Sequence, residues 1–138
     1  MITYEFIVEP TPEQIRQIMN LYKTEGWWSI EDENYDVITG LIKGSHCFLA
    51  AIEQNQIIGM GRAISDKTSD AYIQDVTVAG AYRKRGIGSE MIKRIISRLH
   101  EDGLGWVALI AEKNSHEFYR QLGFDQMPDS LPMIRKKK

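Results

Sequence analysis

The chain has 138 residues, of which 43% are hydrophobic and 26% charged, and its formal net charge is −2. This composition fits one globular domain spanning residues 1–138, and the near-neutral charge gives no electrostatic basis for binding nucleic acid or a membrane surface. No apolar stretch approaches the roughly 18 residues of a membrane-spanning helix, and the N-terminus lacks a signal-peptide pattern, so we expect a cytoplasmic protein.

The first part of the chain predicts one strand followed by two helices. Alternating apolar residues predict a strand over residues 2–8. Thr11-Pro12-Glu13-Gln14 is a capping box with proline at the first helical position, and it predicts a helix that ends at Gly26. A weaker helical pattern covers residues 33–43.

A hairpin is predicted next, with strands over residues 46–53 and 56–65 and a turn at Gln54-Asn55. Cys47, the sole cysteine, lies in the apolar run of the first of these strands. An internal disulfide is therefore excluded. The pattern around Cys47 indicates a small buried apolar residue rather than a nucleophile.

The central part of the chain predicts a strand–helix–strand unit. The strand covers residues 72–78, the amphipathic helix residues 87–99 and the second strand residues 106–111. Such a unit requires its two strands to be parallel, whereas hairpin strands are antiparallel. We therefore expect an α/β fold with a mixed sheet and helices on both faces.

The last part of the chain predicts one more helix and further strands. Asn114 and Glu117 form a capping box, and Gly123 ends the helix. The tail over residues 124–134 is expected to supply one or two antiparallel strands, which would bring the sheet to about six or seven strands.

The turn between the strand at 72–78 and the helix at 87–99 carries Arg83-Lys84-Arg85-Gly86-Ile87-Gly88. A helix start presents unpaired backbone N–H groups, and its dipole favours negative charge. The two glycines let the backbone approach an anion closely. The turn therefore predicts a site for the phosphate groups of a ligand.

Two familiar phosphate loops do not explain this turn. The P-loop spacing of Gly-x-x-x-x-Gly-Lys followed by Ser or Thr is absent. The dinucleotide fingerprint Gly-x-Gly-x-x-Gly is matched only in part, because Met91 stands at the third glycine position. The alternative is a tight turn that binds no ligand and whose arginine side chains face solvent.

A third pattern fits better. Arg83-x-x-Gly86-x-Gly88 after a Val-x-Val strand resembles the acetyl-coenzyme A loop of the GCN5-related N-acetyltransferase (GNAT) family. Residues 112–124 are similar to the family's second motif, Asn-x-x-(x)-x-Phe-Tyr-x-x-x-Gly-Phe. Both motifs lie on the expected elements, and the order β-α-α-β-β-β-α-β-α-β extends the resemblance over nearly the whole chain. The resemblance implies the acyl-CoA N-acyltransferase fold and transfer of an acetyl group from acetyl-CoA to a primary amine, by direct attack in a ternary complex and without a metal.

The resemblance also implies how the coenzyme is held. Backbone N–H groups at the helix start and the basic side chains before it would bind the pyrophosphate, with at least one of the three basic side chains facing solvent. The family splays the strand at 72–78 away from its parallel neighbour, which leaves backbone groups free for the pantetheine arm. The expected coenzyme-binding residues are Val76, Thr77, Val78, Arg83, Lys84, Arg85, Gly86, Ile87, Gly88, Ser89, Asn114 and Tyr119.

Two residues are candidates for proton transfer. Tyr119 matches the family's general acid, which protonates the leaving thiolate; its alternative is a core aromatic residue beside Phe118. Asp75 lies in an otherwise apolar strand, where a carboxylate needs a partner. It could be the base that deprotonates the amine, a ligand for the ammonium group, or a structural ion pair.

The acceptor is expected to be a small-molecule amine. Tyr22, Trp27, Trp28 and Tyr35 could form an aromatic wall that suits an apolar or cationic amine, with Gln74 as a further contact. Amines of proteins and peptides are alternative acceptors. The strand at 73–78 and Glu112-Lys113-Asn114 also look similar to the glucosamine-6-phosphate N-acetyltransferase branch, although no extra basic cluster for a sugar phosphate is evident.

Two other classes of function are kept as alternatives. The domain could bind acyl-CoA without turnover as a regulatory module, although the presence of Tyr119 favours an enzyme. A protein that binds NAD or ATP is disfavoured by the missing third glycine and the missing acidic ribose ligand. The resemblance also leaves a homodimer open, because pairing through C-terminal strands is common in the family.

Overall fold

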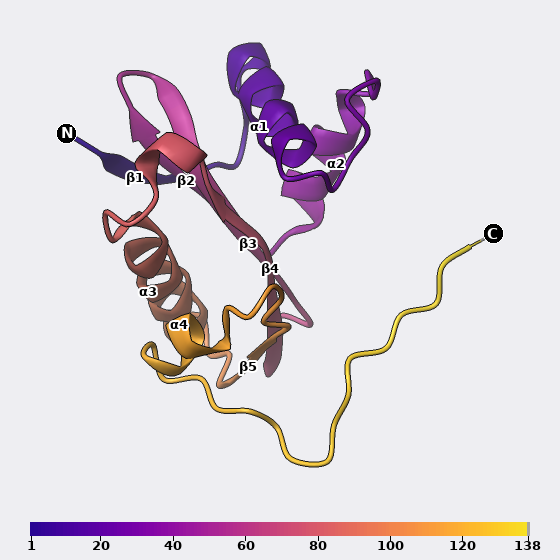
Figure 1. The fold of residues 1–138 in the computed structure, drawn as a ribbon, viewed down its shortest axis with the longest axis vertical. Helices are drawn as coiled ribbons and strands as arrows, with labels where there is room; N and C mark the ends of the chain where they lie inside the picture. The colour runs from indigo at the N-terminus through magenta and orange to yellow at the C-terminus, as the bar shows by residue number, and fades with distance from the viewer. Residues whose placement is uncertain (138) are drawn as a thin grey trace.

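A mixed sheet with the strand order β1-β2-β3-β4-β5 carries the fold of residues 1–137, which the computed structural model describes (Figure 1). The strands are β1 (Thr3–Phe6), β2 (Cys47–Glu53), β3 (Gln56–Ser65), β4 (Asp70–Val78) and β5 (Trp106–Leu109). The helices are α1 (Pro12–Thr24), α2 (Asp36–Gly44), α3 (Ile87–Glu101) and α4 (His116–Arg120), with a 3₁₀ turn at Gly80–Tyr82. None of the helices in this part of the chain has the length and apolarity that crossing a membrane requires.

Local sequence signals set the boundaries of the early elements. The predicted capping box is confirmed, because the Thr11 side chain accepts a hydrogen bond from the Gln14 amide (3.1 Å) and the Gln14 side chain accepts one from the Thr11 amide (3.0 Å). The β2–β3 hairpin turns at Gln54 and Asn55, which both have positive φ (49° and 63°), as a two-residue turn of this hand requires.

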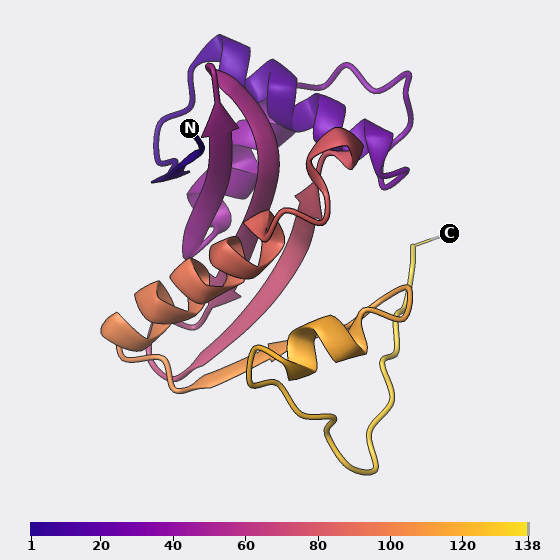
Figure 2. The same ribbon diagram turned by 60° about the vertical axis from the view of Figure 1, so that its left-hand side comes forward.

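Both faces of the sheet are buried, each under its own helices. On one face α3 packs Met91, Ile95 and Leu99 against the sheet, and on the other α1 and α2 pack side chains such as Ile18 and Ile38 (Figures 1 and 2). This arrangement confirms the predicted mixed sheet with helices on both faces. Cys47 is buried in the α3-side core, where burial raises the pKa of its thiol to about 11.

The strands β1 to β4 are antiparallel neighbours, and only β4 and β5 are parallel. Their pairing covers Asp70–Ile73 against Trp106–Leu109, after which β5 leaves the edge of β4 (Figure 2). On its other edge β4 has a register shift opposite Met60 and Arg62, and Asp75 adopts φ 59°. A β-bulge therefore lies where β4 parts from β5.

Two predictions for the C-terminal part were wrong. Residues 1–137 contain five strands rather than six or seven, and the described tail has no strand. It runs away from the body with Leu131, Met133 and Ile134 exposed (Figure 1). Pro128 and Pro132 interrupt it and cannot donate to a strand ladder.

The predicted capping box at Asn114 and Glu117 does not form either. Ser115 is the N-cap of α4, without a side-chain capping bond. Lys113 and Asn114 adopt positive φ (54° and 61°), so the chain turns before the helix begins. The Ser115 hydroxyl donates instead to the carbonyl oxygen of Glu112 (2.6 Å).

Candidate active site

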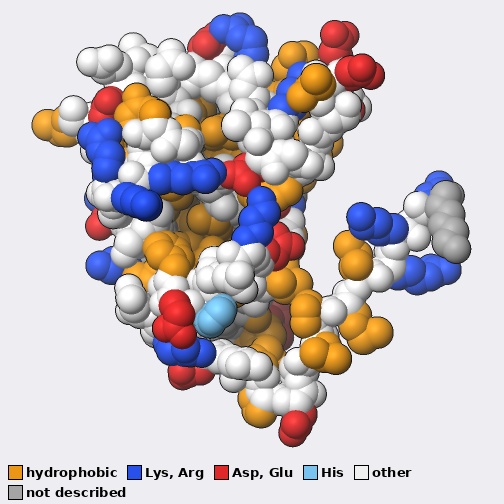
Figure 3. Space-filling model, viewed as in Figure 1, with side chains coloured by type: hydrophobic (Ala, Val, Ile, Leu, Met, Phe, Trp, Pro, Cys, Tyr) orange, Lys and Arg blue, Asp and Glu red, His pale blue; other side chains and the backbone are white. Residues whose placement is uncertain are grey.

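A cavity of about 740 Å³ opens where β5 leaves β4. Its wall is formed by residues just after α1, by β4 from Tyr72 onward, by the loop before α3 with the first turn of α3, by the end of β5 with the segment after it, and by α4. Figure 3 shows this face of the molecule as an apolar hollow with basic side chains along its upper rim. The predicted site residues on the wall are Trp27, Gln74, Asp75, Val76, Thr77, Val78, Arg83, Lys84, Gly86, Ile87, Gly88, Ser89 and Tyr119.

The second half of β4 has an open edge on the cavity side. Within residues 1–137, its stretch from Gln74 to Val78 has no strand partner in β5. The Ala79 amide donates to Ile58 of β3 (2.7 Å), and backbone directions alternate along a strand, so the Val78 amide and carbonyl point away from β3 into the gap. The Val78 carbonyl oxygen accepts a hydrogen bond from Arg83 Nε (2.9 Å).

The start of α3 faces the same cavity. Gly86 caps the helix with φ 80°, and no side chain bonds to the first turn. The first amide with a helical partner is that of Glu90, which donates to the Gly86 carbonyl (3.1 Å). The preceding amides at Ile87, Gly88 and Ser89 are therefore the free N–H groups of a helix start, in position for an anion.

The three basic side chains before α3 lie differently. Arg83 and Lys84 line the cavity, whereas Arg85 lies over the Tyr82 ring (5.4 Å) and outside the wall. The expectation that at least one of them faces solvent fits Arg85, whose side chain is exposed. Two cations therefore remain beside the free amides of α3.

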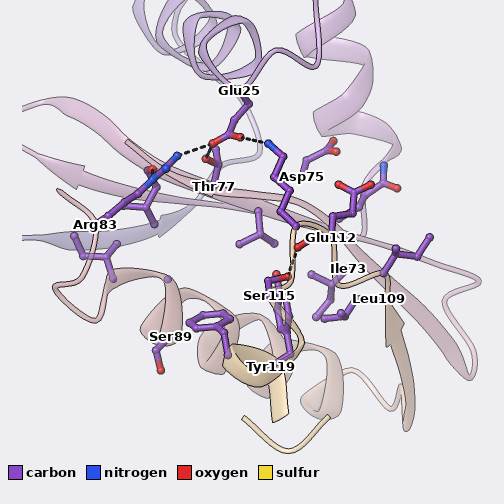
Figure 4. A pocket seen from close by; sticks show the side chains of 18 of the residues that line it. Glu25, Ile73, Asp75, Thr77, Arg83, Ser89, Leu109, Glu112, Ser115 and Tyr119 are labelled. Carbon is purple, nitrogen blue, oxygen red and sulfur yellow. Dashed lines mark hydrogen bonds and ion pairs between the residues drawn. The ribbon is translucent and has the colours of Figure 1, made fainter. Parts of the chain in front are cut away.

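Tyr119 lies on the α4 side of the cavity, facing the β4 edge (Figure 4). Its ring is packed edge-to-face against Phe118 and Phe124, with centroids 5.0 and 5.8 Å away. Burial raises the pKa of its hydroxyl, and the negative charge of Glu112 raises it further. The hydroxyl therefore keeps its proton at neutral pH and can donate it.

Asp75 sits in an ion pair on the cavity wall. Its Oδ2 accepts hydrogen bonds from the Tyr22 hydroxyl and from Arg62 Nε, each at 2.7 Å. Burial and the Asp75 charge both raise the pKa of Tyr22. Of the three roles that the sequence left open, the structure contains the ion pair.

The aromatic residues near α1 are divided between core and cavity. Trp27 lines the cavity, whereas Tyr22 is buried and Trp28 stacks on it with centroids 4.0 Å apart. Tyr35 is exposed, with the Lys23 ammonium 5.8 Å from its ring centroid. Of the predicted aromatic wall, Trp27 lines the cavity, and so does Gln74 of β4.

Asn114 and the histidines lie outside the cavity wall. Asn114 is exposed in the turn before α4, although the resemblance implied a contact with the pantetheine arm. His46 bonds to Asp102 and Ser65 (both 2.7 Å), and His100 and His116 are exposed. Among residues 1–137, no group of three or more His, Cys, Asp or Glu side chains is arranged to hold a metal ion.

Sequence reasoning missed Glu25, which follows the last turn of α1. Its carboxylate accepts hydrogen bonds from the Thr77 hydroxyl and from Arg83 Nη2 (2.9 Å), and Lys113 Nζ lies 3.7 Å away (Figure 4). An acidic residue at a helix C-terminus is unfavourable for the helix dipole. That local conflict is the one signal in the sequence that Glu25 has another role.

Comparison with known proteins finds similarity to acetyltransferases. A family model described as "Acetyltransferase (GNAT) family" matches residues 12–124. The chain is 39% identical over 79 residues to the histone acetyltransferase TAP1 of Glycine max, covering 57% of this chain and 34% of that protein. It is 32% identical over 79 residues to the chloroplastic GCN5-related N-acetyltransferase 2 of Arabidopsis thaliana, covering 57% and 31%. The chain thus spans about a third of the length of these curated relatives.

Solved structures show the same fold over the whole chain. A GNAT family acetyltransferase from Streptococcus pneumoniae superposes with a TM-score of 0.80 at 24% identity, covering 100% of this chain and 99% of that one. A predicted acetyltransferase from Clostridium acetobutylicum, solved with acetyl-CoA, gives 0.74 at 18% identity, covering 97% and 96%. At these identities the likeness shows the fold alone. Since the family model covers all elements from α1 to α4, the chain belongs to the GNAT family of acetyltransferases.

Proposed function

We propose that this protein transfers the acetyl group of acetyl-CoA to a primary amine of a small-molecule acceptor, with both substrates bound and the amine attacking directly. The observation that carries the proposal is the cavity between β4 and β5, which has free helix amides at one end and Tyr119 on its wall. Its volume of about 740 Å³ lies in the range of small-molecule sites.

The residues around the cavity suit the coenzyme. The amides of Ile87, Gly88 and Ser89, with Arg83 and Lys84 beside them, suit a pyrophosphate. The open edge of β4 at Val78 presents an amide and a carbonyl, as a strand presents them to an added strand, which suits the amides of the pantetheine arm. When bound, acetyl-CoA supplies the activated thioester.

Tyr119 is proposed as the proton donor to the departing thiolate. A thiol has an ordinary pKa of about 8.5 and a tyrosine of about 10. Because the pKa of Tyr119 is raised further, its hydroxyl is fully protonated at neutral pH. As the bond to the acyl carbon breaks, negative charge develops on the sulfur, and a protonated hydroxyl held on the cavity wall can donate its proton to that sulfur.

The acceptor is proposed to enter from the α1 side, where Trp27, Gln74 and Asp75 line the cavity. Asp75 is the proposed acid–base group on this side, and its Oδ2 accepts hydrogen bonds from Arg62 and Tyr22. An aromatic ring and a carboxylate together suit a cationic amine.

A ligand panel followed by an activity assay tests the proposal. Thermal unfolding with acetyl-CoA, CoA, NAD and ATP is expected to show stabilisation by the two coenzyme A species. Release of free thiol from acetyl-CoA in the presence of a library of primary amines then shows turnover. Stabilisation by NAD or ATP alone would contradict the proposal, and coenzyme binding without thiol release for any amine would favour a regulatory module.

A further inference from the structure

Glu25 lies where the acceptor and coenzyme parts of the cavity meet. It comes from the end of α1, and its carboxylate connects three other segments: β4 through Thr77, the loop before α3 through Arg83, and the loop after β5 through Lys113 (Figure 4). The side chain is only 13% exposed and borders the cavity, as Trp27 also does. A carboxylate in such a place needs a positive partner.

The two carboxylates on this side of the cavity differ in how their charge is balanced. Asp75 is paired with Arg62, whose side chain is 9% exposed, so a ligand cannot easily displace it. Glu25 is paired with Arg83 and Lys113, whose side chains are 58% and 74% exposed. Exposed ion pairs are weak and exchange readily. A bound cation can therefore replace the present partners of Glu25 and pair with its carboxylate.

Arg83 holds Glu25 with the same guanidinium that faces the proposed coenzyme site. Its Nη2 donates to Glu25 and its Nε donates to the Val78 carbonyl on the open edge of β4. A pyrophosphate is a strong bidentate partner for arginine, and a ligand amide along β4 would compete for the Val78 carbonyl. Coenzyme binding therefore draws Arg83 away and leaves an oxygen of Glu25 without its closest cation.

We infer that Glu25 binds the positively charged nitrogen of the acceptor, and that this ammonium site forms when coenzyme binding withdraws Arg83. The inference rests on the proposed acetyltransferase function and deepens it by naming the acceptor class: aliphatic amines that are cationic at neutral pH. Trp27 lines the same cavity, and an aromatic ring is a second group that attracts a cation. Neutral acceptors such as arylamines gain nothing from this site.

Binding of a diamine and its neutral isostere tests the inference without knowledge of the natural acceptor. The wild-type protein, with and without saturating CoA, is titrated with cadaverine and with pentane-1,5-diol, and the midpoint of thermal unfolding is recorded. Cadaverine is expected to stabilise the CoA complex more than the free protein, and the diol is expected to stabilise neither. Equal responses to the diamine and the diol in the CoA complex would overturn the inference.

Two charge-matched variants assign the effect to Glu25. Glu25→Gln keeps the size of the side chain and an oxygen for Thr77, and it should weaken cadaverine binding to the CoA complex at least about tenfold. The same variant should bind CoA as tightly as wild type or more tightly, because Arg83 is released. Glu13→Gln, at the opposite end of α1 and outside the cavity, is the control and should respond like wild type.

The outcomes separate this inference from the proposed function. If the wild type binds no acetyl-CoA, both fail. If acetyl-CoA binds and amines are acetylated but Glu25→Gln leaves the cadaverine response unchanged, only the role of Glu25 is wrong. If Glu25→Gln loses CoA affinity and keeps the cadaverine response, Glu25 is a structural support of the coenzyme loop and the inference fails.

Discussion

The two halves of β4 belong to one strand but have different neighbours. From Ala71 to Ile73 the strand is paired on both edges, with β3 and with β5. From Gln74 to Val78 only the β3 edge is paired, on either side of the bulge, and every residue of this half lines the cavity, together with Tyr72 and Ile73. The difference teaches that one strand can serve the fold with its first half and a ligand with its second, because a backbone edge without a partner is a binding surface.

The largest expected effect comes from Tyr119→Phe, at a residue that faces the half of β4 without a β5 partner. Loss of the proton donor should lower kcat by about 10²–10⁴-fold, while the affinity for acetyl-CoA should change less than about twofold. Thiol release and calorimetric binding measure the two quantities. Tyr72→Phe, which removes a cavity-lining hydroxyl from the paired half, is the control. Equal kcat values for the two variants would contradict the assignment.

The pH dependence of the wild type sharpens the same assignment. The pKa of Tyr119 is raised by burial and by Glu112, so its hydroxyl stays protonated to a higher pH than an ordinary tyrosine. Loss of the donor at alkaline pH should therefore begin above about pH 10. A loss of kcat centred well below that pH, and absent from Tyr119→Phe, would show that this pKa is lowered instead.

The next effect concerns the ion pair at the β-bulge. Arg62→Met leaves the Asp75 carboxylate with Tyr22 as its hydrogen-bond donor and without a cation, which should lower the free energy of unfolding by about 3–5 kcal/mol. Adding Asp75→Asn should recover much of this loss. Urea unfolding measures both, with Arg16→Met, in an exposed ion pair, as the control. A cost no larger than that of Arg16→Met would contradict a structural role for the pair.

A pair of neighbouring substitutions tests the division of β4 itself. Ile73→Ala, at a buried position in the paired half, should lower the free energy of unfolding by about 2–5 kcal/mol. Gln74→Ala should cost less than about 1 kcal/mol, yet it should raise the KM for the amine. Urea unfolding and steady-state kinetics give the two numbers. If Gln74→Ala proves the more destabilising of the two, the division is wrong.

The smallest effect is that of salt. Arg83 and Lys84 border the coenzyme part of the cavity and are exposed, so their attraction for a pyrophosphate is screened by added ions. Raising NaCl from low concentration to about 0.5 M should weaken acetyl-CoA binding roughly three- to tenfold, with little change in the midpoint of thermal unfolding of the free protein. Unchanged affinity would indicate that the helix amides alone hold the phosphates.

The sequence by itself determined the features that depend on near neighbours. The capping box at Thr11 and Gln14, the hairpin turn at Gln54-Asn55 and the strand–turn–helix around Gly86 all appear where their patterns predict them. Each depends on residues within a few positions of one another, so periodicity and turn chemistry suffice to predict them. Tyr119 could be singled out from the sequence for the same reason, because it is part of a local motif.

Only the tertiary structure decided which distant side chains meet in the site. Tyr22 and Asp75 are 53 positions apart in the chain, Thr77 and Glu25 are 52 apart, and Arg83 and Glu25 are 58 apart. The point at which β5 leaves β4 likewise depends on contacts between elements. Local sequence patterns indicate whether a segment is a helix or a strand and where it begins and ends. Contacts between elements depend instead on how the two layers of helices pack on the sheet.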